Sequence, residues 1–288
     1  MRIRAVLVAV ALALVSADGA ALAQSSPLDA FVTREDVLGW EAVGRVEIGD
    51  TGFCTGTLIA TDLVLTAAHC LYDPSRPGTL NDISTYRFRA GLRSGAFVAE
   101  RGVLRGIAHP AFVYTERGTA EGIRSDVALL QLDAPIPAAA ASPFTVDALP
   151  GSQTEIAVVS VAAGREQTLS IQRRCSVTGR AGGLFRFDCD VAPGSSGAPV
   201  FDMAQGRGRI VSVVSSGNAE GGRVTSYGME LPQLVADLRR AMRAAGPVAP
   251  VTAPLLLRTG GAGSGQTGEG GAARGETRAG GALFLKAP

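Results

Sequence analysis

From Ala42 onward, the hydrophobic positions of the chain form short runs that are separated by polar and glycine-containing turns. The runs, which are rich in Val, Leu, Ile and Thr, are AVGRVEI, TGTLIA, LVLTAA, GVLRGIA, VALLQL, EIAVVSV, RRCSVTG, LFRFDCD, GRIVSVVSS and RVTSYGM. Short strands that repeat with turn residues between them are typical of an all-β sandwich or barrel. The stretch DAPIPAAAASPF, residues 133–144, should contain no strand, because proline cannot donate to a strand ladder. It therefore divides the predicted strands into two β units.

The ends of the chain do not follow the strand pattern, and they set the limits of the two β units. Residues 24–41 form a polar leader or pro-segment without a clear period. We predict the first unit over about 42–140 and the second over about 145–230, followed by a helix over 231–245. The apolar residues that recur at helical spacing there are Leu231, Leu234, Val235, Leu238 and Met242. Residues 246–288 are rich in Gly, Ala, Thr and Pro, which indicates a disordered tail.

The first 23 residues have the pattern of a secretory signal peptide. Met1 to Arg4 form a positively charged start, Ala5 to Val15 are apolar, and Ala21-Leu22-Ala23 supply small residues for cleavage before Gln24. The alternative is a membrane anchor, but the apolar run is shorter than the roughly 20 residues that span a bilayer. We therefore expect a secreted or periplasmic protein that is free of the membrane once the signal is removed.

Charge gives no reason to expect a nucleic-acid partner. The chain has 27 basic and 26 acidic residues, for a net charge of +1, and the two signs are interspersed along it. Such a balance creates no strong field for a polyanion and is typical of a solvated surface. Hydrophobic residues make up 46% of the chain, which is enough for a sizeable core.

Four cysteines, Cys54, Cys70, Cys175 and Cys189, are present in a chain that we expect to be exported, so disulfides are the favoured interpretation. Four cysteines allow three connectivities, and the simplest pairs Cys54 with Cys70 and Cys175 with Cys189. Each pair closes a short loop, for which loop entropy gives about 3 kcal/mol of stability. A zinc site is the weaker alternative, because the chain has no C-x-x-C motif and two histidines in all. We expect no metal.

The two histidines limit where nucleophilic catalysis could occur. A catalytic serine needs a histidine that takes its proton and a buried carboxylate that orients the histidine. His69 follows an apolar strand and two alanines and precedes Cys70, which can hold the segment covalently. His109 lies beside Pro110 and is interpreted as a turn residue with a structural role.

Asp126 is the better placed of two candidate carboxylates. It stands immediately before the apolar run of SDVALLQLD, which would carry it toward the core, whereas Asp133 stands at the far end of that run. Taken alone, Asp126 is most simply a turn residue at the start of a strand. Beside His69 and the serine pair Ser195-Ser196, it becomes the candidate partner of the histidine.

The motifs LTAAHC, SDVALLQL and GSSGAP, in this order, resemble those of the trypsin/chymotrypsin-like serine peptidases. The longer stretches CTGTLIATDLVLTAAHCL and DCDVAPGSSGAPV are most similar to the bacterial secreted branch, which includes the glutamyl endopeptidases. The resemblance covers residues from about 42 to 243. It implies an all-β fold of two six-stranded antiparallel β-barrels with a C-terminal helix. It also implies a monomeric serine endopeptidase that acts on peptides through an acyl-enzyme and needs no cofactor.

The same resemblance assigns the catalytic residues. The pattern Gly, any residue, catalytic Ser, Gly, small, Pro selects Ser196 as nucleophile and places the oxyanion hole at the N–H groups of Gly194 and Ser196. His69 would act as base and then as acid, and Asp126 would orient it. Ser195 would be a neighbour whose side chain turns away.

Further residues are implied for substrate binding. Ser215, Ser216 and Gly217 match the segment that pairs with the substrate backbone, although they could be ordinary residues at the end of a strand. Asp190 precedes Ser196 by the offset of the acidic pocket base of trypsin, which would favour Arg or Lys in the substrate. The alternative is that Asp190 only ties down the hairpin beside Cys189. Val214 stands where glutamyl endopeptidases carry a histidine, so strict cleavage after Glu is not expected.

One departure from the trypsin pattern bears on activation. Trypsin-type enzymes carry Asp before the nucleophile, where it pairs with the amine that zymogen cleavage releases, and here Ser195 occupies that position. Two alternatives to a peptidase remain open: a catalytically silent binding protein on the same fold, and a serine esterase with the same triad.

Overall fold

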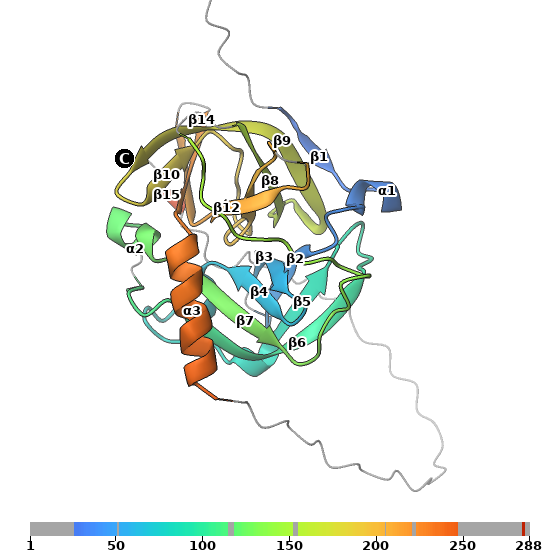
Figure 1. Ribbon diagram of the computed structural model, residues 1–288, viewed down its shortest axis with the longest axis vertical. Helices are drawn as coiled ribbons and strands as arrows, with labels where there is room; N and C mark the ends of the chain where they lie inside the picture. Colours follow the sequence, from blue (N-terminus) through green and yellow to red (C-terminus); the bar gives the residue numbers. More distant parts are fainter. Residues whose placement is uncertain are drawn as a thin grey trace, which may run out of the picture.

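The computed structural model of the chain describes residues 26–50, 52–114, 118–151, 155–204, 206–220, 223–246 and 284–285. Its strands are β1 (Leu28–Ala30), β2 (Val43–Ile48), β3 (Gly52–Ala60), β4 (Leu63–Thr66), β5 (Tyr86–Ala90), β6 (Ala99–Ala108), β7 (Ala128–Leu132), β8 (Glu155–Ala162), β9 (Arg165–Ala181), β10 (Leu184–Phe187), β11 (Pro199–Asp202), β12 (Arg209–Val213), β13 (Ser216–Glu220), β14 (Arg223–Met229) and β15 (Phe284–Leu285). Its helices are α1 (Arg34–Val37), α2 (Ala120–Arg124) and α3 (Pro232–Ala244), with 3-10 turns at Ala68–Leu71 and Ile83–Thr85. The strands form two β bodies stacked on one another (Figure 1).

The first body is a closed barrel of antiparallel strands in the order β2-β3-β4-β7-β6-β5. In β5 the buried residues Tyr86, Phe88 and Ala90 alternate with Arg87 and Arg89, as expected when one face of a strand lines a core. The residues of β3 are buried from Gly52 to Ile59 without alternation, because β3 lies between the barrel interior and the second body. This strand therefore connects the two cores.

The second body is a curled sheet in the order β12-β11-β8-β9-β10-β14, which β13 and β15 extend and β1 joins alongside β9. Its two ends meet at Ser212 of β12, whose hydroxyl donates to the Met229 carbonyl at 2.8 Å and accepts from the Met229 N–H at 3.0 Å. Gly228 allows this approach, since a Cβ there would lie 2.3 Å from the Val213 carbonyl oxygen. The predicted all-β, chymotrypsin-like fold class is confirmed, but the second body is a curled sheet and not the second closed six-stranded barrel that was expected.

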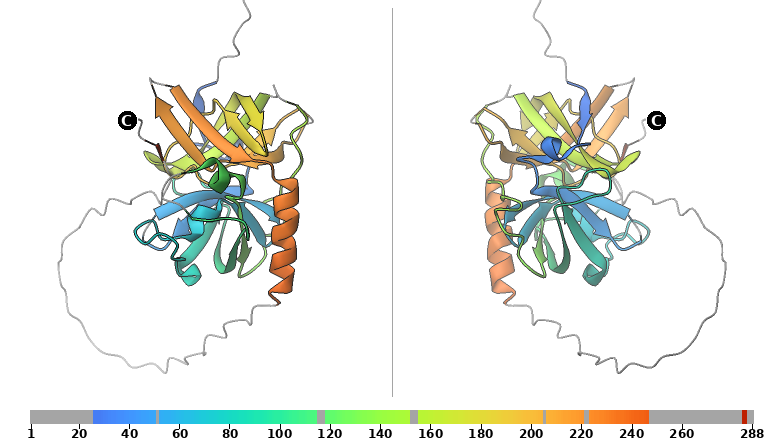
Figure 2. Two further views of the ribbon diagram at one scale, coloured as in Figure 1. Left: turned by 90° about the vertical axis from the view of Figure 1, so that its left-hand side faces the viewer. Right: turned by 90° about the vertical axis from the view of Figure 1, so that its right-hand side faces the viewer.

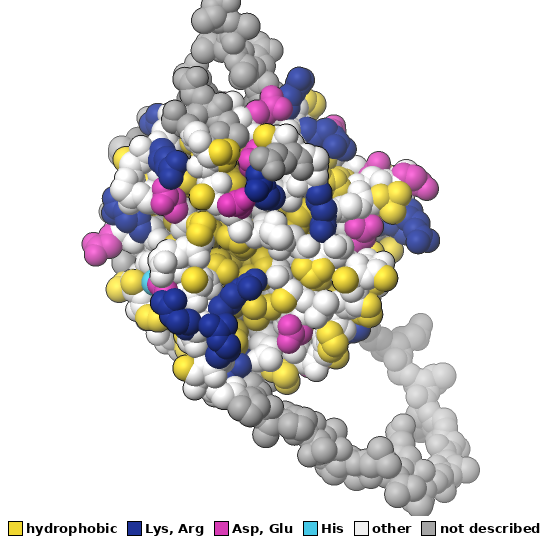
Figure 3. Space-filling model, viewed as in Figure 1, with side chains coloured by type: hydrophobic (Ala, Val, Ile, Leu, Met, Phe, Trp, Pro, Cys, Tyr) yellow, Lys and Arg dark blue, Asp and Glu magenta, His cyan; other side chains and the backbone are white. Residues whose placement is uncertain are grey.

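The C-terminal helix predicted over 231–245 is confirmed as α3, which runs along the first barrel beside β6 and β7 (Figures 1 and 2). It buries Val235, Leu238 and Met242 against that barrel, while its arginines lie at the surface. Charges of both signs are scattered over the face seen in Figure 3, with a group of basic side chains over the helix. None of the helices within the described ranges is long and apolar enough to cross a membrane.

The leader and the tail contain short elements that the sequence pattern did not predict. In the leader, β1 pairs with β9, and α1 begins with a capping box between Thr33 and Asp36. In the tail, β15 pairs in parallel with β13. The predicted signal peptide and its cleavage before Gln24 lie outside the described residues, as does the rest of the tail, 247–283 and 286–288.

Candidate active site

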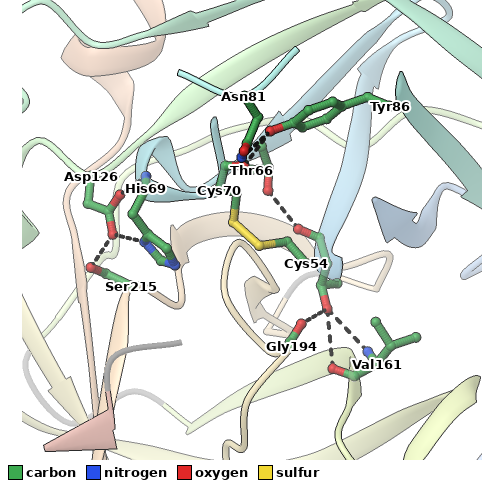
Figure 4. The surroundings of a disulfide bond; sticks show 11 residues. Cys54, Thr66, His69, Cys70, Asn81, Tyr86, Asp126, Val161, Gly194 and Ser215 are labelled. Carbon is green, nitrogen blue, oxygen red and sulfur yellow. Dashed lines mark hydrogen bonds and ion pairs between the residues drawn. A yellow bond between two sulfur atoms is a disulfide. The ribbon is translucent and has the colours of Figure 1, made fainter. Parts of the chain in front are cut away.

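A disulfide fixes the segment that carries His69. Cys54 of β3 is bonded to Cys70, which follows His69 in the 3-10 turn after β4 (Figure 4). Cys175 and Cys189 form the second disulfide, so both predicted pairs are confirmed. Each close group of metal-ligating side chains among the described residues includes one of these disulfides, whose sulfurs are not free to bind a metal.

The ring of His69 is held by Asp126, which lies just before β7 and is 3% exposed. One carboxylate oxygen of Asp126 lies 2.7 Å from His69 Nδ1, and the other accepts the His69 backbone N–H at 2.8 Å (Figure 4). The Ser215 hydroxyl donates to Asp126 Oδ2 at 2.5 Å. Because the carboxylate accepts at Nδ1, the neutral ring carries its hydrogen there and presents a lone pair at Nε2. Nε2 is buried and has no hydrogen-bond partner within the described ranges.

A tight turn precedes Ser196. The Ser195 N–H donates to the Ala192 carbonyl at 2.9 Å, and Gly194 has a φ of +96°. Proline second and a left-handed glycine third are the features of a type II turn, so the sequence Ala192-Pro193-Gly194-Ser195 encodes it locally. The Ser195 hydroxyl points to β8, where it lies 3.4 Å from the Ser160 hydroxyl. It also accepts the Ala192 N–H at 3.3 Å.

The backbone around Ser196 leaves two N–H groups without an acceptor. The Pro193 carbonyl accepts the Ala163 N–H at 2.7 Å, and the Ser195 carbonyl accepts the Ala198 N–H at 2.9 Å. In a planar trans peptide the N–H points opposite to the C=O, so these bonds set the directions of the Gly194 and Ser196 N–H groups. Neither N–H donates to an acceptor within the described part of the chain. Two adjacent unpaired donors can receive a negatively charged oxygen.

Comparison with known proteins identifies the family of the chain. Residues 54–211, more than half of the chain, match the family model described as a trypsin-like peptidase domain. The chain belongs to the trypsin-like peptidase family. A solved structure of a Glu endopeptidase in complex with MPD is similar with a TM-score of 0.61 at 17% identity, over 75% of this chain and 97% of that chain. At this identity the likeness concerns the fold, and no curated protein matches the chain in sequence.

Beside His69, the trypsin-like peptidase has an apolar pocket that the sequence did not predict. The residues that line it are His69, Phe112, Gly118, Gly122, Ile123, Asp126, Ser215 and Ser216. Ile123 comes from α2, a helix too short to give a periodic pattern, and Phe112 follows the turn at His109. The pocket therefore draws on segments that are brought together only by folding.

Three of the four candidate substrate-binding residues are consecutive at the start of β13. Ser216 and Gly217 pair with Tyr227 and Ser226 of β14, and Ser215 directly precedes them. Asp190 does not line the pocket beside His69, but the carbonyl of its neighbour Cys189 accepts from the hydroxyl of Ser226, which pairs with Gly217. The Asp190 N–H donates to the Gln172 side chain of β9 at 2.7 Å, and its carboxylate accepts from the same amide at 3.3 Å.

Gln172 links Asp190 to the leader of the trypsin-like peptidase. The side chain of Gln172 is fully buried, and its amide also donates to the Ser26 carbonyl at 2.8 Å. The carboxylate of Asp190 thus has a structural partner, which is the alternative role considered for it.

The second histidine and the second aspartate have structural contacts. His109 Nδ1 accepts the Ala111 N–H at 3.2 Å, and its Nε2 lies 3.6 Å from Asp237 of α3. Asp133 is exposed and accepts the Gly102 N–H at 3.1 Å. Neither lines the pocket beside His69.

We expect Gly194→Ala to lower kcat by roughly 10²–10³. This is the size of effect that follows the loss of one donor to an oxyanion, the role considered for the Gly194 N–H. A Cβ there would lie 2.2 Å from the Phe53 ring, so the turn must move. Gly183→Ala is the matched control, because Gly183 has a similar φ of +81° but no atom within 4 Å of the added Cβ. Steady-state kinetics of both variants check this, and equal losses at the two glycines would contradict it.

Proposed function

We propose that this trypsin-like peptidase is an exported serine endopeptidase whose catalytic residues are Ser196, His69 and Asp126. The observation that carries the proposal is the state of His69, with Nδ1 held by a buried carboxylate and Nε2 buried and unpaired. The Thr55 N–H donates to the Ser196 carbonyl at 2.8 Å, and Thr55 adjoins Cys54 of the disulfide beside His69. Within the described residues, His69 Nε2 makes no hydrogen bond to Ser196 Oγ. Such a contact between base and nucleophile is often loose without substrate and tightens when substrate binds.

In the proposed reaction, Ser196 Oγ bonds to the scissile carbonyl carbon while its proton moves to His69 Nε2. The carbonyl oxygen becomes an oxyanion, which the Gly194 and Ser196 N–H groups bind. His69 then gives the proton to the departing amine as the C–N bond breaks, leaving an acyl-enzyme. Water then attacks the acyl carbon and gives a proton to His69. The ester bond to Ser196 Oγ breaks as His69 returns that proton to Oγ, and the acid product leaves. Asp126 stays ionised and stabilises the imidazolium that forms twice.

The substrate is proposed to bind as an extended peptide along Ser215, Ser216 and Gly217, through backbone hydrogen bonds that do not depend on side chains. The edge of β13 that faces away from β14 is paired with β15 at Gly217, opposite Phe284, so a substrate that extends to Gly217 must displace β15 there. Asp190 is the candidate contact for the side chain of the residue before the scissile bond. An ionised Asp190 would favour Arg or Lys through a charge-assisted bond. Val214 offers no imidazole for a substrate carboxylate, so a Glu-specific enzyme is not proposed.

Cleavage-site profiling on a peptide library, with matching ester substrates, tests the function. We expect endoproteolytic cleavage with a preference for Arg or Lys that weakens in Asp190→Ser. Turnover of esters alone would favour a serine esterase, and a folded protein that turns over neither would favour a silent binding protein. A flat or Glu-dominated profile, or a profile that Asp190→Ser does not change, would discard the basic preference while leaving the peptidase in place.

Activation is proposed to need no internal cleavage. Ser195, in the place of the zymogen aspartate, bonds to Ser160, whose hydroxyl accepts from Arg165 Nη2 at 2.9 Å. Burial lowers the pKa of the Arg165 guanidinium to about 10, so it stays charged at neutral pH. This hydrogen-bonded chain would hold the turn without a new amine.

Protein that starts at Gln24 is therefore expected to be active as produced. Two arginines near the leader are candidate sites for an activating cut. Arg34 begins α1, and Arg45 is buried in the central part of β2, a strand that pairs with β3 on one side and β5 on the other. Activity and intact mass measured on the same sample check the prediction. Protein that stays inert until it is cut after Arg34, or at another defined internal site, would contradict it.

A further inference from the structure

Thr55 of β3 makes two hydrogen bonds to the turn that carries Ser196. It is fully buried beside Cys54, and its N–H donates to the Ser196 carbonyl at 2.8 Å. Its hydroxyl lies 2.9 Å from the Gly194 carbonyl, to which it donates, and accepts the Val161 N–H of β8 at 3.2 Å (Figure 4). The Val161 carbonyl lies farther away, at 3.4 Å, and one hydroxyl hydrogen serves one acceptor well.

With these two bonds, every carbonyl of the turn around Ser196 accepts a hydrogen bond. The four carbonyls from Pro193 to Ser196 each accept one hydrogen bond, from the Ala163 N–H, the Thr55 hydroxyl, the Ala198 N–H and the Thr55 N–H in turn. Thr55 supplies two of the four, from the opposite barrel. The bonds from Ala163 and Ala198 set the directions of the Gly194 and Ser196 N–H groups, and the two bonds from Thr55 hold the peptides on either side of the one that carries the Ser196 N–H. A donor pair that is already oriented costs no reorganisation when an oxyanion forms.

Thr55 is itself held from three sides. The Thr66 hydroxyl donates to the Thr55 carbonyl at 2.8 Å, the Val161 N–H donates to its hydroxyl, and its neighbour Cys54 is bonded to Cys70. Gly197 packs against the same place, since a Cβ there would lie 2.4 Å from the Thr55 carbonyl oxygen. The hydroxyl is therefore a fixed donor and not one of several rotamers on a surface.

We infer that the Thr55 hydroxyl is a positioning group for the oxyanion hole. It holds the Gly194–Ser195 peptide, which joins the two peptides that carry the Gly194 and Ser196 N–H groups, and it does not touch the substrate. The inference rests on the proposed function for its kinetic consequence and on the hydrogen bonds alone for its effect on the turn. Thr55→Val keeps the shape of the side chain but removes the donor. The Gly194 carbonyl then loses its partner, and the Gly194–Ser195 peptide is held by one hydrogen bond in place of two, from the Ser195 N–H to the Ala192 carbonyl.

The test compares Thr55→Val with Thr55→Ser, which keeps the hydroxyl, and with Thr57→Val. Thr57 is a matched control: it lies two residues along β3, is equally buried, and its hydroxyl is 3.3 Å from the Ala42 carbonyl, away from the turn. We expect Thr55→Val to lower kcat by roughly 10–10², less than the loss of a direct donor, with KM unchanged. A peptide aldehyde, whose oxygen enters the hole after Ser196 adds to it, should bind weaker by a similar factor. Thr55→Ser and Thr57→Val should keep the wild-type kcat.

Amide hydrogen exchange measures how often the hydrogen bonds of the turn open, and it does not require catalytic activity. It therefore tests this inference separately from the proposed function. In Thr55→Val, the N–H groups of Ser195 and Gly197, which are hydrogen-bonded in the wild type, should exchange faster, with no such change in Thr57→Val. Should Thr55→Val not fold, Thr55→Ala is measured against Thr57→Ala by the same criteria. Unchanged exchange and kcat in the Thr55 variant, or equal changes in the Thr57 variant, would overturn the inference. If exchange rises in Thr55→Val but the wild type lacks peptidase activity, the positioning holds and the proposed function fails.

Discussion

Replacing Ser196 with alanine is expected to lower kcat for peptide cleavage by on the order of 10⁶, while the protein remains folded. The reason is that no other group in the proposed reaction can form the acyl-enzyme. The site is buried and the change removes one oxygen atom, so the hydrogen bonds of the turn to Thr55 and Ala198 are kept. Steady-state kinetics measure the loss, and the thermal unfolding midpoint shows that the fold is intact.

The neighbouring serine provides the control for this prediction. The hydroxyl of Ser195 contacts Ser160 and the Ala192 N–H, on the side of β8. Ser195→Ala should therefore weaken the turn slightly and leave most of the activity. Equal losses for the two serines, or the larger loss at Ser195, would show that the nucleophile has been assigned to the wrong residue.

Asp126→Asn is expected to lower kcat by on the order of 10⁴. The carboxylate accepts three hydrogen bonds, from the His69 N–H, from His69 Nδ1–H and from the Ser215 hydroxyl. An amide has one acceptor oxygen and a donor group, so it cannot accept on both sides. Where its NH₂ group faces Nδ1, the ring must carry its hydrogen at Nε2, and it loses the lone pair that takes the proton of Ser196.

Ser215→Ala is the comparison for Asp126→Asn. It removes one of the three donors but leaves the carboxylate and the tautomer of His69 unchanged, so the loss of kcat should be far smaller. Kinetics of the two variants with one peptide substrate measure the difference. If Asp126→Asn retained most of the wild-type kcat, the orienting role of Asp126 would be refuted.

The fold was predictable where strands are long and apolar. Runs such as VALLQL and EIAVVSV mark β7 and β8, and the Pro- and Ala-rich stretch between them is free of strands. The short strands β5, β11 and β13 were missed as separate elements. In β5 the alternation of aromatic residues with Arg87 and Arg89 was a usable signal, whereas β11 continues directly from the turn around Ser196. The strand β1 gave no signal, because it is three residues long, exposed, and held by pairing with β9.

In the candidate site, too, some residues were predictable from the sequence and others were not. His69, Asp126 and Ser196 lie in local motifs, and the structure places Asp126 against His69. Thr55, Phe112 and Ile123 could not be identified from the sequence, because their importance comes from contacts between segments distant in the chain. Gln172, which holds Asp190, is a polar residue in a strand and is distinguished only by its complete burial. Tertiary contacts of this kind have no pattern in a single sequence.

The most direct test of the central claim is the intact mass of the protein starting at Gln24 after reaction with a fluorophosphonate, followed by peptide mapping. The reagent forms a bond from phosphorus to an activated serine oxygen and releases fluoride. We predict one adduct per chain, on Ser196, with loss of peptidase activity in proportion to labelling and no adduct in Ser196→Ala. A folded protein that takes no label, or that takes it on Ser195, would contradict the account.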